Sequence, residues 1–397
     1  MRTEAIVPTR LPWLGLVLLL ASCTPSLRST VQADGRLRPP TPAVEHDLQR
    51  ILDKHRITTA GLGMLVDGKL VWALYHGDAS QGVPANAATR FNVASITKTV
   101  TAETALRLAE AGELDLDESL AAYWVDPDIA GDPRLPSLTA RTVLTHTTGF
   151  PNWRFFRSDG KLAFTRTPGE AYGYSGEGFE YLARAISNKL QRPFPQVVRE
   201  RVLEPAGMQH AVMEVRRDGL RDVAVPVDDE GVAHGVWCRP NGWCRGEGSY
   251  SAADDMLITV PDYARFLGMV ARQESRNAGT PFARSRVRVD TGDDAVVRCG
   301  DGAGVDCPRA QGYGLGFQII EDEATRIVGH GGNDWAEVTL GYIRLPTRDG
   351  LVIFLNAPNA RGLAAMPDLV ERLDPDSPFP NQYRRWLAHD LAQKATR

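Results

Sequence analysis

The sequence predicts an α/β (α+β) domain with one mostly antiparallel sheet that is built from both ends of the chain and flanked by helices. Strand-like apolar runs occur at residues 61–77 and again at 325–358, and amphipathic helix patterns lie between them. The chain of 397 residues is 43% hydrophobic and 24% charged, which is enough for a large core. A helical lobe, roughly residues 105–310, is therefore expected to be inserted between the two halves of the sheet.

The N-terminus has the pattern of a targeting segment. Two arginines precede an apolar run at residues 11–21, which is too short to cross a bilayer and is typical of a signal peptide. The run leads into "LASC", which resembles a bacterial lipoprotein signal, so residues 1–22 would be removed and Cys23 lipidated. Thr24 follows, and the resemblance then implies the bacterial cell envelope, on the periplasmic face of the outer membrane. An ordinary cleaved signal with an incidental cysteine is the alternative.

A proline-rich tether and a helix are expected next. Residues 23–42 end in "LRPPTP" and show no hydrophobic periodicity, so the domain itself is expected over residues 43–397. "AVEHDLQRILDKH" at 43–55 has the pattern of an amphipathic helix. Asp67-Gly68 then joins two apolar runs, which is the strongest short-range signal for a β-hairpin.

The middle of the chain combines helix patterns with long loops. After a helix that begins near Ser95, further helices are expected at residues 177–190, 194–203 and 252–271, the last broken by Pro261. Residues 272–312 form a long irregular stretch, in which "ARSRVRV" (283–289) is typical of a solvated loop face. Strands return at residues 325–332, 337–346 and 350–358, and two last helices begin at Leu363 and Asn381.

Charge and cysteine usage exclude some classes of function. The net charge of −4 gives no field that would attract nucleic acid. Four cysteines besides Cys23 form two couples around turn-rich loops, Cys238/Cys244 and Cys299/Cys307. In an oxidising compartment these spacings favour two short-range disulfides, whereas a four-cysteine zinc site would require tighter spacing. No metal or organic cofactor is implied, and no pattern sets the oligomeric state.

The first catalytic candidate is "SITK", Ser95 to Lys98. Ser95 stands where a helix N-cap belongs, but Lys98 takes the place of the Glu or Gln of a capping box and opposes the helix dipole. A serine hydroxyl attacks well when a base removes its proton, and a lysine can do so when its surroundings lower its pKa. The free N–H groups of the helix start would stabilise an oxyanion. A second S-x-x-K, Ser158 to Lys161, lies in a loop without a helix to fix the two groups.

Two distant stretches complete a pattern. "PGEAYGYSGEG" places Tyr174 in a glycine-rich turn before a helix, and "VGHGGNDW" places His330 at the end of a strand. Together with "LTARTVLTHTTGF" and "GSYSAADDM", these motifs make residues 44–358 resemble the serine β-lactamase and penicillin-recognising family, in the branch of class C β-lactamases and related esterases. The resemblance implies the β-lactamase/transpeptidase-like fold.

The resemblance also implies a role for each motif. Ser95 would be the acylated nucleophile, Lys98 its base, and Tyr174 the group that carries the proton to the leaving group. The backbone N–H groups of Ser95 and Asn333 would form the oxyanion hole. His330 would line the wall opposite the nucleophile.

Two departures from the family pattern set the expected substrate class. The Asn of the Y-x-N motif is Gly176 here, and the Lys-Thr of K-T-G is His330-Gly331, ahead of Gly332. A charge-assisted hydrogen bond is worth about 1.5–3 kcal/mol, so recognition of a substrate carboxylate should be weaker by one or two decades. Esterase-like hydrolysis of a small-molecule ester or amide is therefore favoured. The alternatives are a β-lactamase, a D,D-carboxypeptidase or D-aminopeptidase acting on a cell-wall peptide, and a non-catalytic relative that binds the cell wall or a partner.

Other candidates have weaker support. His146 in "LTHTTG" is expected to be structural. Three tryptophans could line an acyl pocket or pack in the core: Trp237, Trp243 and Trp335. An α/β-hydrolase is excluded because "HGGN" follows "GYSGEG" along the chain, and because Glu177 replaces the last glycine of G-x-S-x-G.

Overall fold

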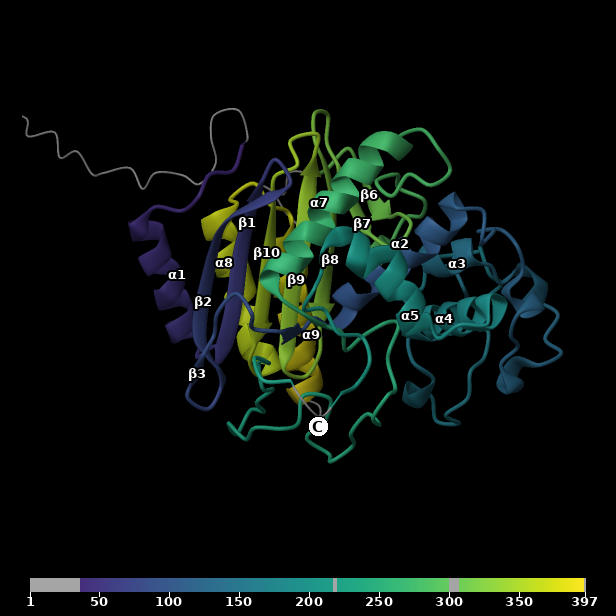
Figure 1. The fold of residues 1–397 in the computed structure, drawn as a ribbon, viewed down its shortest axis with the longest axis horizontal. Coiled ribbons are helices and arrows are strands. Elements are labelled where there is room, and N and C mark those ends of the chain that lie inside the picture. Colours follow the sequence, from purple (N-terminus) through teal and green to yellow (C-terminus); the bar gives the residue numbers. More distant parts are fainter. Residues whose placement is uncertain (1–35, 217–219, 300–306, 396–397) are drawn as a thin grey trace, which may run out of the picture.

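One eight-stranded antiparallel sheet forms the centre of the molecule (Figure 1). The computed structural model describes residues 36–216, 220–299 and 307–395. The strands of the sheet are β1 (Thr59–Val66), β2 (Lys69–Ser80), β3 (Val83–Pro84), β6 (Ala310–Tyr313), β7 (Gln318–Glu321), β8 (Arg326–Asn333), β9 (Glu337–Leu345) and β10 (Gly350–Asn356). Their order is β3-β2-β1-β10-β9-β8-β7-β6. Because β1 pairs with β10, the sheet is built from both ends of the chain, as the sequence predicts.

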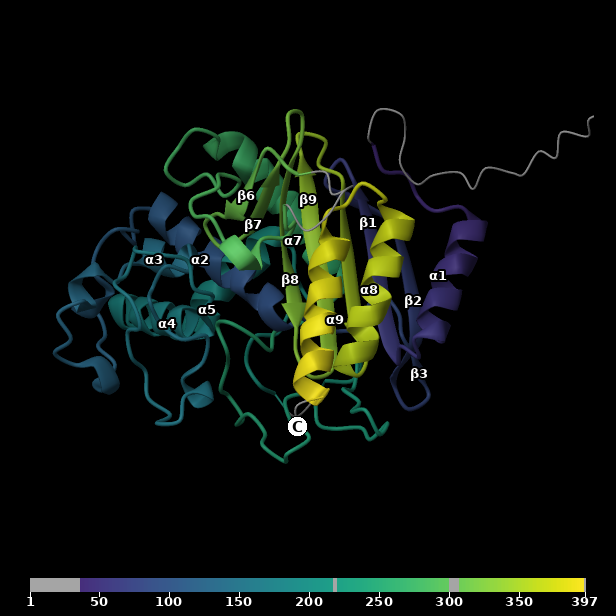
Figure 2. The same ribbon diagram turned by 180° about the vertical axis from the view of Figure 1, so that it is seen from behind.

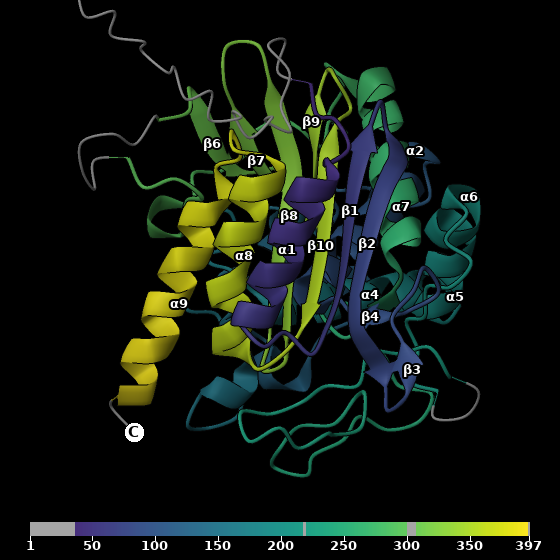
Figure 3. The same cartoon turned by 90° about the vertical axis from the view of Figure 1, so that its left-hand side faces the viewer.

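Helices cover both faces of the sheet (Figures 2 and 3). One face carries three helices, α1 (Pro42–Lys54), α8 (Asn359–Leu373) and α9 (Phe379–Ala395). Their apolar sides form one core cluster with the side chains on that face, including Leu48, Ile353 and Leu369. The opposite face packs against α7 (Val260–Asn277), whose Val260 and Tyr263 belong to a second and larger cluster.

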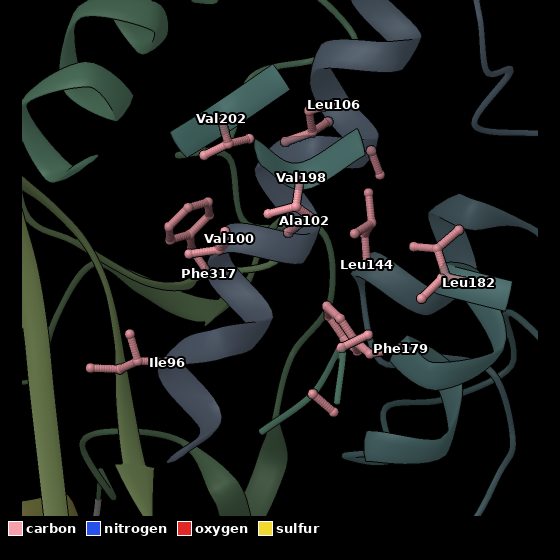
Figure 4. Packing of buried hydrophobic residues seen from close by; sticks show 14 of the residues in the cluster. Ile96, Val100, Ala102, Leu106, Leu144, Phe179, Leu182, Val198, Val202 and Phe317 are labelled. Carbon is pink, nitrogen blue, oxygen red and sulfur yellow. The ribbon is translucent and has the colours of Figure 1, made fainter. Parts of the chain in front are cut away.

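The second cluster continues into the helical lobe beside the sheet. The lobe contains α2 (Thr97–Glu110), α3 (Ala140–Leu144), α4 (Gly176–Leu190), α5 (Phe194–Val198) and α6 (Glu204–Ala206), with a π-helical turn at Arg199–Leu203. Figure 4 shows apolar side chains of α2, such as Val100 and Leu106, among those of α3, α4 and α5. The helix that begins just after Ser95 is therefore enclosed by packed side chains, which fixes its position.

The expected hairpin, the two last helices and the three C-terminal strands are confirmed, but the helix expected at residues 252–271 is wrong in its first part. Pro261 stands in the first turn of α7, where its missing N–H is not needed. Thr259 caps this helix by accepting a hydrogen bond from Asp262 N at 3.1 Å. The residues before it include β5 (Leu257–Ile258), which pairs with β4 (Phe91–Asn92). The proline therefore starts the helix and does not break it.

The cluster "ARSRVRV" is not a solvated face throughout. Arg284 is fully buried and donates to both carboxylate oxygens of Glu103, at 2.9 and 3.1 Å. It also lies 2.9 Å from Glu110. A charged side chain is buried in this way only when it is paired. The expectation for this segment is wrong because the partners are carboxylates of α2, far away in sequence.

The end of the expected tether is part of the folded domain. Arg36 forms a bidentate ion pair with Asp349, which precedes β10, and Leu37 is buried. The signal peptide, Cys23 and the rest of the tether lie outside the described residues. Both predicted disulfides are confirmed, Cys238–Cys244 and Cys299–Cys307. No helix within the described ranges has the length and apolar character needed to cross a membrane.

Candidate active site

The turn that carries Ser95 is not the N-cap that the sequence suggests. Ser95 lies inside a 3-10 turn, Ala94–Ile96, that runs directly into α2. Ala94 has a φ of 47°, in the left-handed region that residues other than glycine rarely adopt. The Asn92 side chain accepts a hydrogen bond from Ala94 N at 3.0 Å and donates to Asp255 at 3.1 Å. These two bonds hold a strained backbone, which is a common feature of functional sites.

The structure brings Ser95 and Lys98 together. Lys98 Nζ lies 3.0 Å from Ser95 Oγ and donates to the carbonyl oxygen of Ala253 at 2.8 Å. Lys98 is only 1% exposed, and no carboxylate in the described part of the chain forms an ion pair with it. The amine is therefore aimed at the hydroxyl by a neutral carbonyl group, within the distance that proton transfer requires.

Tyr174 is the third predicted residue at this point. It lies in the loop before α4, and Lys98 Nζ is 4.8 Å from the centroid of its ring. Ser175, the next residue, caps α4 through a hydrogen bond from Gly178 N at 3.1 Å. The glycine-rich turn and the helix start that the sequence indicates thus place the phenol beside the Ser95–Lys98 pair.

His146 fixes the loop that carries Tyr174. Its ring is buried, 4.2 Å from the Tyr174 ring between centroids. Its Nδ1 accepts a hydrogen bond from Ser175 N at 3.1 Å, and its carbonyl oxygen accepts one from Gly173 N at 2.8 Å. Burial, and then the positive charge of Lys98, lower the pKa of His146 well below its ordinary value. These contacts agree with the structural role that the sequence predicts.

His330 lies on β8, on the other side of the pair. Its ring centroid is 6.2 Å from that of Tyr174. Its Nδ1–H donates to the carbonyl oxygen of Gly331 at 2.5 Å, and its Nε2 accepts from the hydroxyl of Tyr313 at 2.9 Å. Burial, and then the charge of Lys98, lower the pKa of His330 to about 3. The imidazole is therefore neutral at physiological pH and does not replace the fixed cation of K-T-G.

This buried histidine makes folding sensitive to acid. The unfolded chain binds a proton at this imidazole below a pKa of 6.5, whereas the folded chain does so only at about 3, so its contribution to stability is lost as the pH falls between these values. Replacing His330 by glutamine removes the contribution. We expect the unfolding free energy of the wild type, relative to His330→Gln, to fall by about 2 kcal/mol from about pH 7 to about pH 5. Urea titrations of both proteins measure it, and a constant difference would contradict it.

The glycines that follow His330 have different neighbours. A Cβ at Gly332 would lie 2.7 Å from the carbonyl oxygen of Val93 and 3.2 Å from the Cβ of Ala94. Only a glycine therefore lets β8 approach the turn that carries Ser95. Asn333, whose N–H is the second predicted oxyanion donor, is the next residue of that strand.

Gly331 faces away from Ser95. A Cβ there would lie 2.7 Å from the hydroxyl of Tyr383 and 3.1 Å from the Trp386 ring, and both residues belong to α9. The space that the threonine of K-T-G would need is filled by this helix. The loss of that hydroxyl therefore has a packing reason, because α9 covers the strand at this residue.

Trp153 is a site residue that the sequence analysis missed. A Cβ at Gly176 would lie 2.4 Å from the Trp153 ring, so the indole occupies the space of the Asn of Y-x-N. Its ring centroid is 5.9 Å from Lys98 Nζ. Of the three tryptophans considered for an acyl pocket, Trp237 is instead buried against Val215, Val223 and Leu257, and Trp243 is half exposed. The glycine at position 176 was a usable signal, since a large neighbour can fill the space it leaves.

A charged network adjoins the end of β8. Carboxylate oxygens of Asp254, Asp255 and Asp334 lie within 4.8 Å of one another, as in a metal site. However, Arg245 donates to Asp255 at 2.9 Å, and Arg239 pairs with Asp334. Burial, and then the charge of Asp255, raise the pKa of Asp254 well above its ordinary value. Two of the three carboxylates are thus bound by guanidinium groups, and the cluster is an ion-pair network.

Comparisons with known proteins agree with this geometry. The Beta-lactamase family matches residues 44–372. Protein flp of Staphylococcus aureus (strain MW2) is 25% identical over 188 residues, which are 43% of this chain but only 37% of flp. An octameric penicillin-binding protein homologue from Pyrococcus abyssi has the same fold, with a TM-score of 0.63 at 21% identity over 86% of this chain and 80% of that chain. A class C β-lactamase has a TM-score of 0.63 at 16% identity, over 84% of this chain and 95% of its own.

The family match covers most of the folded domain and includes every motif of the site. The fold similarity to a class C β-lactamase extends over nearly the same part of the chain. The protein therefore belongs to the Beta-lactamase family of serine hydrolases.

Proposed function

We propose that the protein hydrolyses esters, and amides less readily, through an acyl-enzyme on Ser95. One observation carries the proposal: Lys98 Nζ lies 3.0 Å from Ser95 Oγ, at the start of a helix enclosed by packed side chains. A binding protein would have no need of a buried amine beside a hydroxyl. The proposal includes a location at the bacterial envelope, with a lipid on Cys23, for which "LASC" is the support.

The proposed reaction has two halves. In the first, the Lys98 amine takes the proton of Ser95 as Oγ bonds to the substrate carbonyl carbon. The N–H groups of Ser95 and Asn333 stabilise the oxyanion, and Tyr174 passes the proton to the leaving group as its bond to carbon breaks. In the second half, water loses a proton to the same groups and attacks the acyl carbon. The acid is then released and Ser95 is restored.

Three features support an ester over a substrate that carries a carboxylate. His330 is neutral, so it supplies no fixed positive charge. The position of the K-T-G threonine is a glycine covered by α9. Trp153 fills the space of the amide-binding Asn. A β-lactam or a D-alanyl peptide would thus lose two of the contacts that the family pattern offers it.

A substrate panel with intact-mass measurement tests the proposal. p-Nitrophenyl acetate, a chromogenic cephalosporin and a D-alanyl-D-alanine peptide are compared, and a fluorophosphonate probe is used to label the nucleophile. We expect the highest kcat/KM for the ester, with one probe adduct on the peptide that contains Ser95. The mass of protein purified from bacterial membranes should also show lipid on Cys23.

Other outcomes would point to the alternative functions. Faster turnover of the cephalosporin or the peptide would replace the esterase proposal by a β-lactamase or D-peptidase. Stoichiometric binding of cell-wall fragments, without any covalent adduct, would favour a non-catalytic relative. An unmodified Cys23 in membrane-purified protein would overturn the proposed anchor alone.

A further inference from the structure

A strip of three aromatic residues runs from the catalytic pair to the surface. Trp153 lies near Lys98, and its ring stacks on that of Phe155 with centroids 5.5 Å apart and planes at 16°. Phe155 in turn meets Phe156 edge to face, with centroids 4.7 Å apart. We call Trp153, Phe155 and Phe156 the aromatic strip. It is a continuous apolar surface whose inner end is at the reacting hydroxyl.

The outer rings are exposed to an unusual degree. Phe155 is 66% exposed and Phe156 is 73% exposed, more than any other large hydrophobic residue among those that the structure describes. Two adjacent exposed phenylalanines are unfavourable in water unless another apolar group covers them. Their position beside the active site indicates that a substrate is that group.

The turn that presents the strip is held firmly. Arg154, between Trp153 and Phe155, donates from N and Nε to the two carboxylate oxygens of Glu177, at 2.9 and 3.0 Å. Its Nη2 donates to Asp126 at 2.8 Å. Glu177 belongs to the first turn of α4, directly after Tyr174 and its cap. The strip is thus fixed relative to the catalytic tyrosine, as a binding surface should be.

The charges around the strip argue against a membrane surface as the partner. Patches that bind anionic lipid combine apolar residues with unpaired Lys or Arg. Here Arg154 is paired with Glu177 and Asp126, and Arg157 is paired with Asp159 at 2.9 Å. The strip therefore presents apolar surface with neutralised charges, which suits an uncharged hydrocarbon chain.

We propose that the aromatic strip binds the apolar chain of the substrate, so that the enzyme prefers esters with a medium-length alkyl or aryl chain over acetates. This inference rests on the proposed function, because the strip is useful only if the scissile bond lies at Ser95. It names a substrate class, hydrophobic esters, and two residues that set specificity, Phe155 and Phe156.

The test compares p-nitrophenyl octanoate with p-nitrophenyl acetate. In the double variant Phe155→Ser/Phe156→Ser, we expect the ratio of kcat/KM for octanoate to that for acetate to fall about tenfold. Leu391→Ser is the matched control, because it removes a half-exposed apolar side chain on α9, away from the strip. It should leave the ratio unchanged.

A second readout separates this inference from the proposed function. Octyl and ethyl fluorophosphonates label Ser95 without any need for ester turnover, and their rate ratio should fall in the double variant as well. If acetate is hydrolysed but neither ratio changes, the strip has no role in specificity although the esterase proposal stands. If no ester is hydrolysed but the labelling ratio falls, the strip is confirmed and the esterase proposal fails. Weaker binding of the double variant to phosphatidylglycerol vesicles, with unchanged ratios, would assign the strip to the membrane and overturn the inference.

Discussion

Lys98→Met is expected to lower kcat/KM for the best ester substrate by about four powers of ten. The reason is that Lys98 Nζ is the basic atom 3.0 Å from Ser95 Oγ, while both histidines nearby are held by other hydrogen bonds. Methionine keeps most of the length and apolar volume of lysine but cannot accept the proton. Steady-state kinetics with p-nitrophenyl esters measure the loss, which should appear mainly in kcat.

The second S-x-x-K of the chain supplies the control. Lys161 follows Ser158 at the same spacing, but it is exposed in a loop, and Lys161→Met should leave the kinetics unchanged. Ser95→Ala sets the floor of the assay. Because nucleophile and base act as a unit, the double variant Ser95→Ala/Lys98→Met should be no slower than either single variant. Lys98→Met that folds normally and keeps a tenth of the activity would refute the role of Lys98 as the base.

The parts of the fold that could be predicted are those with strong local patterns. The hairpin at Asp67-Gly68 has φ values of 53° and 72°, the left-handed pair that favours this dipeptide in a tight turn. The last three strands are long apolar runs, and α1 has a clear amphipathic period. Short strands such as β6 and β7 carry no such pattern, since their four residues are strands only because β8 lies beside them.

The active site divides in the same way. Ser95, Lys98 and Tyr174 could be predicted because each lies in a local motif, and the motifs occur in one order along the chain. Trp153 and Asn92 could not, because what gives them a role is a contact with a residue distant in sequence. The strained Ala94 was also unreadable, since only the packing of β8 against its turn requires that conformation.

Arg284→Met is expected to reduce the unfolding free energy by about 3–5 kcal/mol, although Arg284 is remote from the catalytic pair in the sequence. The guanidinium is fully buried and holds both oxygens of Glu103, which is fully buried as well. Removing it leaves a carboxylate inside the core beside α2, the helix that carries Lys98. Urea unfolding measures the change, and the catalytic rate per folded molecule should change far less than the stability.

The size of this effect depends on burial, and the same helix offers the comparison. Arg107 also binds Glu103, at 2.7 Å, but its side chain is 22% exposed, so Arg107→Met should cost only about 1 kcal/mol or less. Adding Glu103→Gln to Arg284→Met should restore part of the lost stability, because the unpaired charge is then removed from the core. Equal losses for the two arginine variants, or no recovery in the double variant, would show that desolvated charge is not what holds this helix in place.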